Sequence, residues 1–343
     1  MKKICLLIVC VVAVMSCGRD RDAGTQVPYI IFETDMGNDI DDAMALDMLY
    51  KYVDAGKARL LAVTINKEGT APAEFVDIMG TWYGYPDVPV GIIRGGADCE
   101  TDAVNYAKAV VGMKSDDGSP LFERSCSGYE NYPDAHILYR KILAGMPDNS
   151  VTVVSVGFST NLARLLETSA DEYSPLSGKE LVARKVKMLC AMGGCMSDRD
   201  FYEYNIVKDI ESAKKVFEEW PTALVTSPFE VGIGIEYPGE SIENDFGWSS
   251  GPHPVVEAYK AYLPMPYDRP VWDLTSVLYC VDNRLEFFTE SPKGTIEVTA
   301  DGATVFTETP GGNRSYLITD DRQGEAVRKH LVRMLTARPA CRK

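Results

Sequence analysis

Short apolar runs alternate with stretches of helical periodicity along most of this chain, and this alternation restricts the fold more than any other feature. Runs without polar interruption are typical of strands that are buried on both faces of a sheet. The segments between them carry apolar residues at helical spacing. The alternation therefore predicts an α/β fold, in which a mostly parallel sheet is covered by helices on both faces.

We expect the strands at 28–33, 59–65, 88–93, 151–156, 186–192 and 223–226. We expect the helices at 41–52, 73–83, 134–144, 161–168, 210–220, 254–262, 273–281 and 324–335. Residues 294–307 alternate like a hairpin with Asp301-Gly302 as its turn, whereas the polar segment 99–132 reads as largely irregular. No linker or composition break divides residues 28–338, so we expect one large domain there.

The N-terminus has the features of an export signal. Two lysines precede an apolar run that is too short for a membrane-spanning helix, which predicts a signal peptide over residues 1–16. The run ends in Val14-Met15-Ser16-Cys17, which resembles a bacterial lipobox and predicts lipidation of Cys17. Residues 17–27 would then form a flexible tether, and the protein would be an exported, membrane-anchored lipoprotein of the periplasm or cell envelope. A buried apolar helix is the alternative.

The charge balance limits the partners. Thirty-five lysines and arginines face 50 aspartates and glutamates, a net charge of −15. Such a chain repels nucleic acid, so a small-molecule partner is favoured, and contact with a membrane is expected only through the lipid. The chain has three histidines, so a metal site must rely mainly on carboxylates.

Five acids fall within ten residues where the first strand ends and the first helix begins: Glu33, Asp35, Asp39, Asp41 and Asp42. Carboxylates this close repel one another unless a cation lies among them. All-oxygen ligands suit a hard divalent ion, and Ca²⁺ accepts many flexible ligands more readily than Mg²⁺. Helix capping and a solvated turn would account for one or two of these acids but not for all five.

Several segments together resemble the nucleoside hydrolase family of the inosine–uridine preferring type. Residues 33–46 read ETDMGNDIDDAMAL, similar to the family signature DxDxGxDDxxAL. Further similar segments are Ser155–Ala163, Met192-Gly193-Gly194, Glu203–Asp209 and Trp272-Asp273-Leu274, in family order. Each segment alone is weak evidence, but the ordered set is strong.

The resemblance implies a Rossmann-like nucleoside hydrolase fold and Ca²⁺ as the cofactor. It places Asp35, Asp42, Asp273 and the Val156 carbonyl as metal ligands. It also makes Asp35 the base that activates a metal-bound water for hydrolysis of the N-glycosidic bond of ribonucleosides or related ribosides.

The same resemblance implies a ribose site. Asp41, Glu203 and Asn205 would bind the sugar hydroxyls, and Met192 would pack near the sugar, although a strand-end core residue is an equal reading of Met192. Two extra residues separate Gly37 from the Asp41-Asp42 pair, so Asp39 competes with Asp41 for the sugar.

The leaving-group side departs most from the family. Trp272 replaces the histidine that precedes the C-terminal aspartate of the family, and none of the three histidines falls in a motif. Trp272 could stack on a ring or donate one N–H, and Tyr202, Tyr204 or a water could donate the proton. The identity of the leaving group and the oligomeric state, a homo-oligomer included, stay open.

Two alternatives to nucleoside hydrolysis remain open. One is a hydrolase of a different glycoside, and the other is a catalytically silent lipoprotein that binds a nucleoside or ribose. Asp35 favours catalysis, because binding alone does not require a base.

Overall fold

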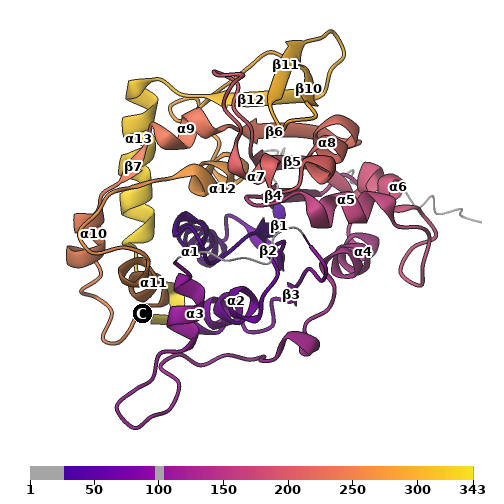
Figure 1. Ribbon diagram of the computed structural model, residues 1–343. Coiled ribbons are helices and arrows are strands. Elements are labelled where there is room, and N and C mark those ends of the chain that lie inside the picture. Colours follow the sequence, from indigo (N-terminus) through magenta and orange to yellow (C-terminus); the bar gives the residue numbers. More distant parts are fainter. Residues whose placement is uncertain (1–26, 97–103, 343) are drawn as a thin grey trace, which may run out of the picture.

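A mostly parallel sheet forms the centre of the molecule (Figure 1). The computed structural model describes residues 27–96 and 104–342. The predicted signal peptide 1–16, the predicted lipidation site Cys17 and all but the last residue of the predicted tether lie outside the described residues. In these two ranges, no helix combines the length and the apolar character needed to cross a bilayer.

Among the described residues, the main sheet has ten strands in the order β11-β10-β12-β6-β5-β4-β1-β2-β3, with β9 beside β12. Its parallel strands are β1 (Tyr29–Thr34), β2 (Arg59–Ile65), β3 (Val90–Gly91), β4 (Val151–Ser155), β5 (Val186–Met192), β6 (Ala223–Ser227) and β12 (Arg314–Ile318). The antiparallel strands are β9 (Thr289–Glu290), β10 (Gly294–Val298) and β11 (Thr304–Glu308). A separate pair joins β7 (Glu236–Tyr237) to β8 (Arg269–Pro270). The predicted α/β class is confirmed.

Burial on both faces explains why the central strands are apolar throughout. Ile30 and Phe32 of β1 belong to one hydrophobic core, whereas Ile31 between them belongs to a second core on the opposite face. All three side chains are fully buried. Helices cover both faces, as predicted, because each core needs its own cover.

The helices divide between these two cores. The first core receives side chains from α1 (Asp41–Asp54), α2 (Thr70–Tyr83), α3 (Tyr106–Val111), α9 (Phe229–Ile233), α10 (Gly239–Asn244), α11 (Pro254–Tyr262), α12 (Trp272–Val281) and α13 (Asp321–Leu335). The second receives them from α4 (Ala135–Gly145), α5 (Thr160–Glu167), α6 (Gly178–Lys185), α7 (Tyr204–Val207) and α8 (Ile210–Glu219).

The elements that the sequence did not predict are mostly short. The segment 99–132, expected to be largely irregular, contains α3 and a 3₁₀ turn at Tyr129–Asn131. α3 buries Tyr106, Ala107 and Val110, and Asn105 caps it, but six residues are too few for a clear helical period. Helices α6, α7, α9 and α10 and strand β12 were also missed. The strand expected at 88–93 shrinks to β3, since Pro89 has no N–H to extend the ladder.

The topology brings the carboxyl ends of four strands to one edge of the sheet. Glu33 of β1 pairs with Ser155 of β4, which pairs with Ala191 of β5, which pairs with Thr226 of β6. The loops that follow these residues therefore begin side by side. In an open α/β sheet this edge is where a ligand binds.

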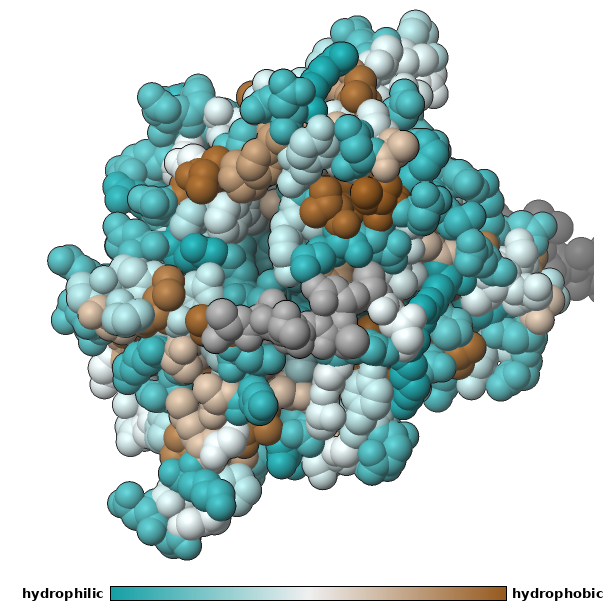
Figure 2. All heavy atoms as spheres, in the orientation of Figure 1, coloured by the Kyte–Doolittle hydropathy of each residue, from teal (hydrophilic) through white to brown (hydrophobic). Residues whose placement is uncertain are grey.

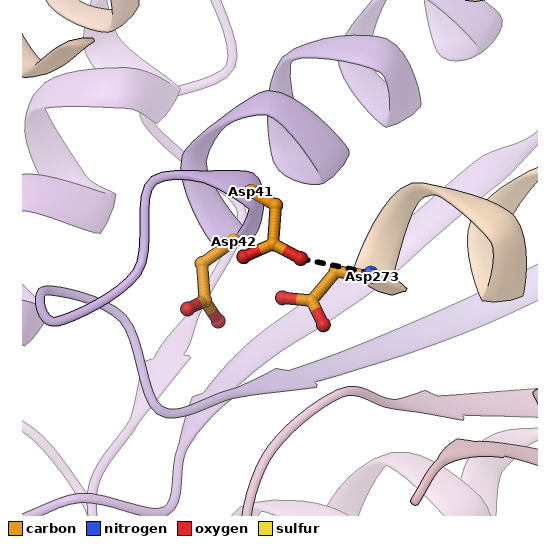
Figure 3. Close-up of side chains that lie close together, drawn as sticks. All are labelled: Asp41, Asp42 and Asp273. Atoms are coloured by element: carbon orange, nitrogen blue, oxygen red, sulfur yellow. Dashed lines mark hydrogen bonds between the residues drawn. The ribbon is translucent and has the colours of Figure 1, made fainter. Parts of the chain in front are cut away.

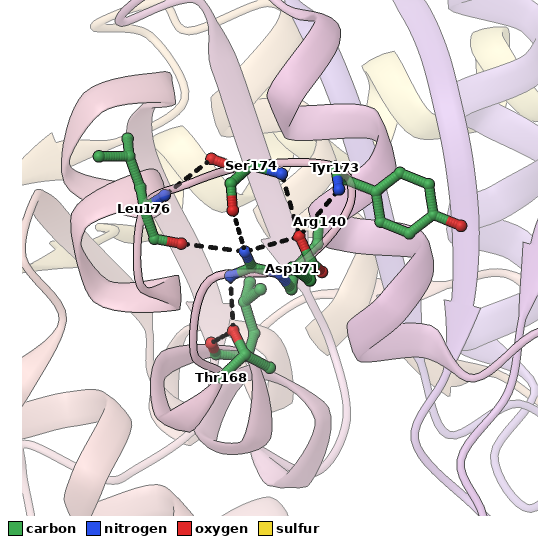
Figure 4. A network of polar contacts seen from close by, with 7 residues as sticks. Arg140, Thr168, Asp171, Tyr173, Ser174 and Leu176 are labelled. Atoms are coloured by element: carbon green, nitrogen blue, oxygen red, sulfur yellow. Dashed lines mark hydrogen bonds and ion pairs between the residues drawn. The ribbon is translucent and has the colours of Figure 1, made fainter.

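A buried arginine holds one of the connections on the second face. Arg140 of α4 is 1% exposed, and its guanidinium donates to Asp171, Thr168 and the carbonyls of Ser174 and Leu176 (Figure 4). These bonds tie α4 to the segment between α5 and α6. Hydrogen bonding to Arg140 lowers the pKa of Asp171 to about 2.

Replacing this arginine should destabilise the domain. We expect Arg140→Met to lower the free energy of unfolding by about 3 kcal/mol, because it leaves several buried acceptors without a donor. Since the pKa of Asp171 lies below its ordinary value, the part of the stabilisation that the Asp171 carboxylate contributes is complete above about pH 4 and is lost as the pH falls toward 2. Urea unfolding at pH 7 and pH 3 measures both effects.

Arg184 provides the matched control, since its side chain is 59% exposed and pairs with Asp148 at the surface. Arg184→Met should cost less than about 0.5 kcal/mol. Equal losses in the two variants would contradict the role assigned to the buried network.

Candidate active site

A cavity of about 560 Å³ opens at the carboxyl edge of the parallel strands. Figure 2 shows a hollow with a hydrophilic floor on this face of the molecule, and hydrophobic side chains gather beside it. Two groups of residues share the wall. The acidic group consists of Asp35, Asp41, Asp42, Glu203 and Asp273. The aromatic group consists of Phe201, Tyr202, Tyr204, Phe229, Tyr262 and Trp272. The volume suits a small organic ligand.

The turn between β1 and α1 is held from both sides. Gly37 has φ of +124°, a conformation that other residues rarely adopt. Its N–H donates to the Tyr106 hydroxyl at 3.1 Å, and the Tyr106 N–H donates to the Gly37 carbonyl at 3.1 Å. Thr34 accepts a bond from the Met36 N–H at 3.1 Å and donates its hydroxyl to Asp42. These bonds orient the first turn of α1 toward the cavity.

Three carboxylates from distant segments meet at the floor of the cavity. Asp41 and Asp42 come from the start of α1, and Asp273 comes from the start of α12 (Figure 3). They offer oxygen atoms that all lie within 4.8 Å of one another, and Asp41 accepts a bond from the Asp273 N–H at 3.1 Å. Burial, and then the charge of the neighbouring carboxylates, raises the pKa of all three well above the ordinary value.

This donor set fits a hard divalent cation. Its atoms are carboxylate oxygens, and the three side chains are at most 4% exposed. Negative charge in such a place is costly unless a cation compensates it. The cluster contains Asp42 and Asp273, which were predicted as ligands, and also Asp41, which was predicted to bind the sugar.

Asp35 lies beside this cluster at the end of β1. It is 4% exposed, and its charge is one of the causes that raise the pKa of Asp42 and Asp273, after burial. Gly157 makes room for it, because a Cβ atom there would lie 2.7 Å from Asp35 Oδ1 and from its backbone nitrogen. Gly157 therefore allows the loop after β4 to approach Asp35 closely.

Glu33 occupies the position where the family signature has its first aspartate, and its side chain is fully buried. It accepts bonds from the Tyr139 hydroxyl at 2.7 Å, from Asn66 Nδ2 at 3.2 Å and from the Thr64 hydroxyl at 3.2 Å. Burial raises its pKa to about 7, although these bonds oppose the rise. Asn66 thus supports Glu33 and is not among the residues that line the cavity.

Glu203 and Asn205 come together at the start of α7. Glu203 caps this helix by accepting bonds from the N–H groups of Asn205 at 2.9 Å and Ile206 at 3.2 Å, and a third bond comes from the Gly194 N–H at 3.0 Å. Burial raises the pKa of Glu203 to about 7. Asn205 Nδ2 donates to the Val156 carbonyl at 3.2 Å and to the Met192 carbonyl at 3.3 Å. Four residues predicted for the site therefore meet here.

Asp39 lines the cavity, but its carboxylate is engaged with Arg269 of β8. Arg269 Nε donates to Asp39 Oδ1 at 2.9 Å, and Arg269 Nη2 donates to the other oxygen. Arg269 was not predicted from the sequence, because it lies 230 residues from Asp39 and belongs to no motif. Its place three residues before Trp272 is the one signal in the sequence.

Three members of the aromatic group stack in a row. The rings of Phe201 and Phe229 stack with centroids 4.2 Å apart, and those of Phe229 and Trp272 lie 5.7 Å apart. The Trp272 indole N–H donates to the Phe229 carbonyl at 3.1 Å, so it is occupied within the protein. The Tyr202 hydroxyl donates to Asp301 at 3.2 Å. Phe201 and Phe229 could not be predicted as site residues from the sequence, because neither belongs to a motif and aromatic residues are common in cores.

Comparisons with known proteins agree with this picture. The family model described as inosine-uridine preferring nucleoside hydrolase matches residues 30–336. A plant nucleoside hydrolase is 20% identical with a TM-score of 0.65, and the match covers 91% of this chain and 100% of that chain. No curated protein matches the sequence.

Two bacterial structures give similar values. A purine-preferring ribonucleoside hydrolase from Gardnerella vaginalis is 14% identical with a TM-score of 0.66, covering 90% of this chain and 98% of its own. An inosine-uridine preferring nucleoside hydrolase from Bacillus anthracis is 15% identical with a TM-score of 0.64, covering 90% and 99%. At these identities the structures show the shared fold.

The close approach at Gly157 yields a test of the site. If the acidic cluster holds a divalent cation, we expect Gly157→Ala to lower the affinity for it at least tenfold, because the new Cβ would displace Asp35 or Asn66, whose Oδ1 would lie 2.6 Å away. Calorimetric titration of the purified protein with Ca²⁺ measures the affinity, and circular dichroism checks the fold. Gly251→Ala is the control, since a Cβ there meets nothing within 4 Å. Unchanged affinity in Gly157→Ala would separate Asp35 from the cation site.

Proposed function

Because this chain belongs to the inosine-uridine preferring nucleoside hydrolase family, we propose that it hydrolyses the N-glycosidic bond of ribonucleosides or related ribosides with Ca²⁺ as its cofactor. Family membership supports N-glycosyl hydrolysis of nucleosides. The observation that carries the proposal for this chain is the meeting of Asp41, Asp42 and Asp273 beside Asp35 in a cavity of nucleoside size.

The proposed cofactor would be held by oxygen atoms alone. Asp35, Asp42, Asp273 and the Val156 carbonyl are the proposed ligands, and Asp41 lies close enough to take part. Ca²⁺ accepts this number and kind of ligand. When bound, such an ion makes water more acidic and attracts the hydroxyl oxygens of a sugar.

The residues of the acidic group would share the reaction. Asp35 would accept the proton of the attacking water, for which its position at the floor of the cavity is suited. Asp41, Glu203 and Asn205 would bind the ribose hydroxyls and fix the sugar so that water meets C1′. Positive charge develops on the ribose as the C1′–N bond breaks, and the surrounding carboxylates would stabilise it.

The other proposed contacts have a smaller part in this scheme. Met192 at the end of β5 lines the cavity and would pack against the sugar. Asp39 also lines it, but the ion pair with Arg269 leaves Asp41 as the better ligand for the diol. Trp272 would contact the leaving group with its ring, since its N–H is already bonded.

Hydrolysis of another glycoside is the second candidate. The family has a histidine on the leaving-group side of its site, but none of the three histidines of this chain lines the cavity, so the leaving group can differ. His136 lies on α4, His253 caps α11 and His330 lies on α13. A silent binding protein is less well supported, because binding alone does not require Asp35 as a base. Export and anchoring through Cys17 remain a proposal that the N-terminal sequence alone supports.

The base can be tested directly. We expect Asp35→Asn to lower the rate of ribose release from inosine or uridine by at least about 1,000-fold, because no proton acceptor remains for the water. A reducing-sugar assay over a panel of nucleosides measures the rate, and the melting temperature checks the fold. A variant as active as the parent would remove Asp35 from this role.

The cofactor can be tested by its effect on stability. Removing Ca²⁺ with a chelator should lower the melting temperature, and restoring it to about 100 times its Kd should return roughly 2.7 kcal/mol. Asp273→Asn should largely abolish this response, whereas Asp87→Asn, at an exposed position, should keep it. A melting temperature that ignores both chelator and Ca²⁺ would contradict a calcium site.

A further inference from the structure

A bidentate ion pair lies next to the aromatic group: Asp39 lines the cavity, whereas Arg269 contacts lining residues without being one of them. Arg269 grips both oxygens of Asp39 through Nε and Nη2. Asp39 lies in the turn before Asp41-Asp42, and Arg269 comes from β8, just before α12. The pair thus joins the two segments that also supply the acidic cluster.

The guanidinium lies against the wall of the cavity. Arg269 Cζ is 5.2 Å from the ring centroid of Tyr262 and 5.2 Å from that of Trp272, and both rings line the cavity. The Arg269 side chain is 22% exposed, so it is not sealed beneath these rings. The cation is therefore held at the border of the aromatic group by a carboxylate and two rings.

Arg269 keeps donors available for a ligand. Its bonds to Asp39 use Nε and Nη2, and within the described part of the chain Nη1 makes no hydrogen bond. A guanidinium offers five N–H groups in one plane. A ligand that reaches Arg269 can therefore accept a hydrogen bond without breaking the ion pair.

The reaction proposed above creates a need for such a group. When the C1′–N bond breaks, its electron pair goes to the nucleobase, while the water oxygen bonds to C1′ and its proton goes to Asp35. The departing base gains negative charge until it takes a proton from solvent. The indole N–H of Trp272 and the hydroxyl of Tyr202 are bonded within the protein, to Phe229 and Asp301.

We propose that Arg269 is the leaving-group residue of this enzyme: held in place by Asp39, it stabilises the negative charge that develops on the departing nucleobase. The inference rests on the proposed function, since it assumes that the ribose occupies the acidic group. If Arg269 has this role, the enzyme prefers nucleosides whose base is neutral and departs as an anion, because such a base carries acceptor atoms that can receive hydrogen bonds from the guanidinium.

The test compares two substrates that differ in how much help the leaving group needs. Inosine releases its nucleobase as a strongly basic anion, whereas 4-nitrophenyl riboside releases a phenolate that is stable without assistance. Arg269→Met should lower kcat/KM by about 100-fold for inosine and by less than about fivefold for 4-nitrophenyl riboside. Arg269→Lys, which keeps the charge, should recover part of the loss on inosine.

Asp39→Asn tests the positioning half of the proposal. It keeps the shape of the side chain but weakens its hold on Arg269, so it should also lower kcat/KM for inosine more than for 4-nitrophenyl riboside. Arg184→Met, far from the cavity at an exposed ion pair, should change neither value. Melting temperature and Ca²⁺ affinity are measured for every variant. If the ion pair were only structural, its loss would change these two quantities and would lower kcat/KM equally for both substrates.

The outcomes separate this inference from the proposed function. Equal losses on the two substrates would overturn the leaving-group role and leave the hydrolase intact. If Arg269→Met does not fold, the ratio of the two losses in Arg269→Lys decides in the same way. A parent protein that cleaves neither substrate in the presence of Ca²⁺ would overturn the proposed function, and the inference with it.

Discussion

The mutual repulsion of buried carboxylates is the constraint on which the rest of this site depends. Burial raises the pKa of Asp41, Asp42 and Asp273, and the charge of neighbouring carboxylates raises it further. The starts of two separate helices, α1 and α12, place these side chains there, so the fold brings buried like charges together at a cost in electrostatic free energy. Such an arrangement is useful only where a cation and a polar ligand relieve it, and strain of this kind is typical of functional sites.

The elements around the cluster hold it in one geometry. The Glu203 carboxylate accepts hydrogen bonds from two N–H groups at the start of α7 and from the Gly194 N–H, and Asn205 bridges the loops after β4 and β5. The C-terminal hairpin supports the loop that leads to them, because Thr304 bonds to both the N–H and the carbonyl of Cys195. The antiparallel hairpin of β10 and β11 therefore stabilises a loop of the site, although the site itself lies at the ends of the parallel strands.

The long elements could be predicted from the sequence because their patterns are strong. β2, β5 and α11 have the bounds that periodicity assigns to them, and both faces of the sheet are covered as expected. The short helices α3, α7 and α9 could not be predicted, since four to six residues carry too little periodicity and tertiary contacts decide their shape. Two of them, α7 and α9, begin at the cavity, where Tyr204 and Phe229 line it.

The amino-acid sequence was enough to predict the fold class, to recognise the family resemblance and to identify the candidate acids, because these follow from local periodicity and from ordered motifs. The different roles of the individual acids follow from the three-dimensional arrangement alone. Asp39 and Asp41 are equivalent in a linear reading, but Arg269, 230 residues beyond Asp39, engages Asp39, and Asp41 joins Asp42 and Asp273. The sequence could not show this, because a charge is assigned its role by its neighbours in space, and those neighbours come from segments that no local pattern connects.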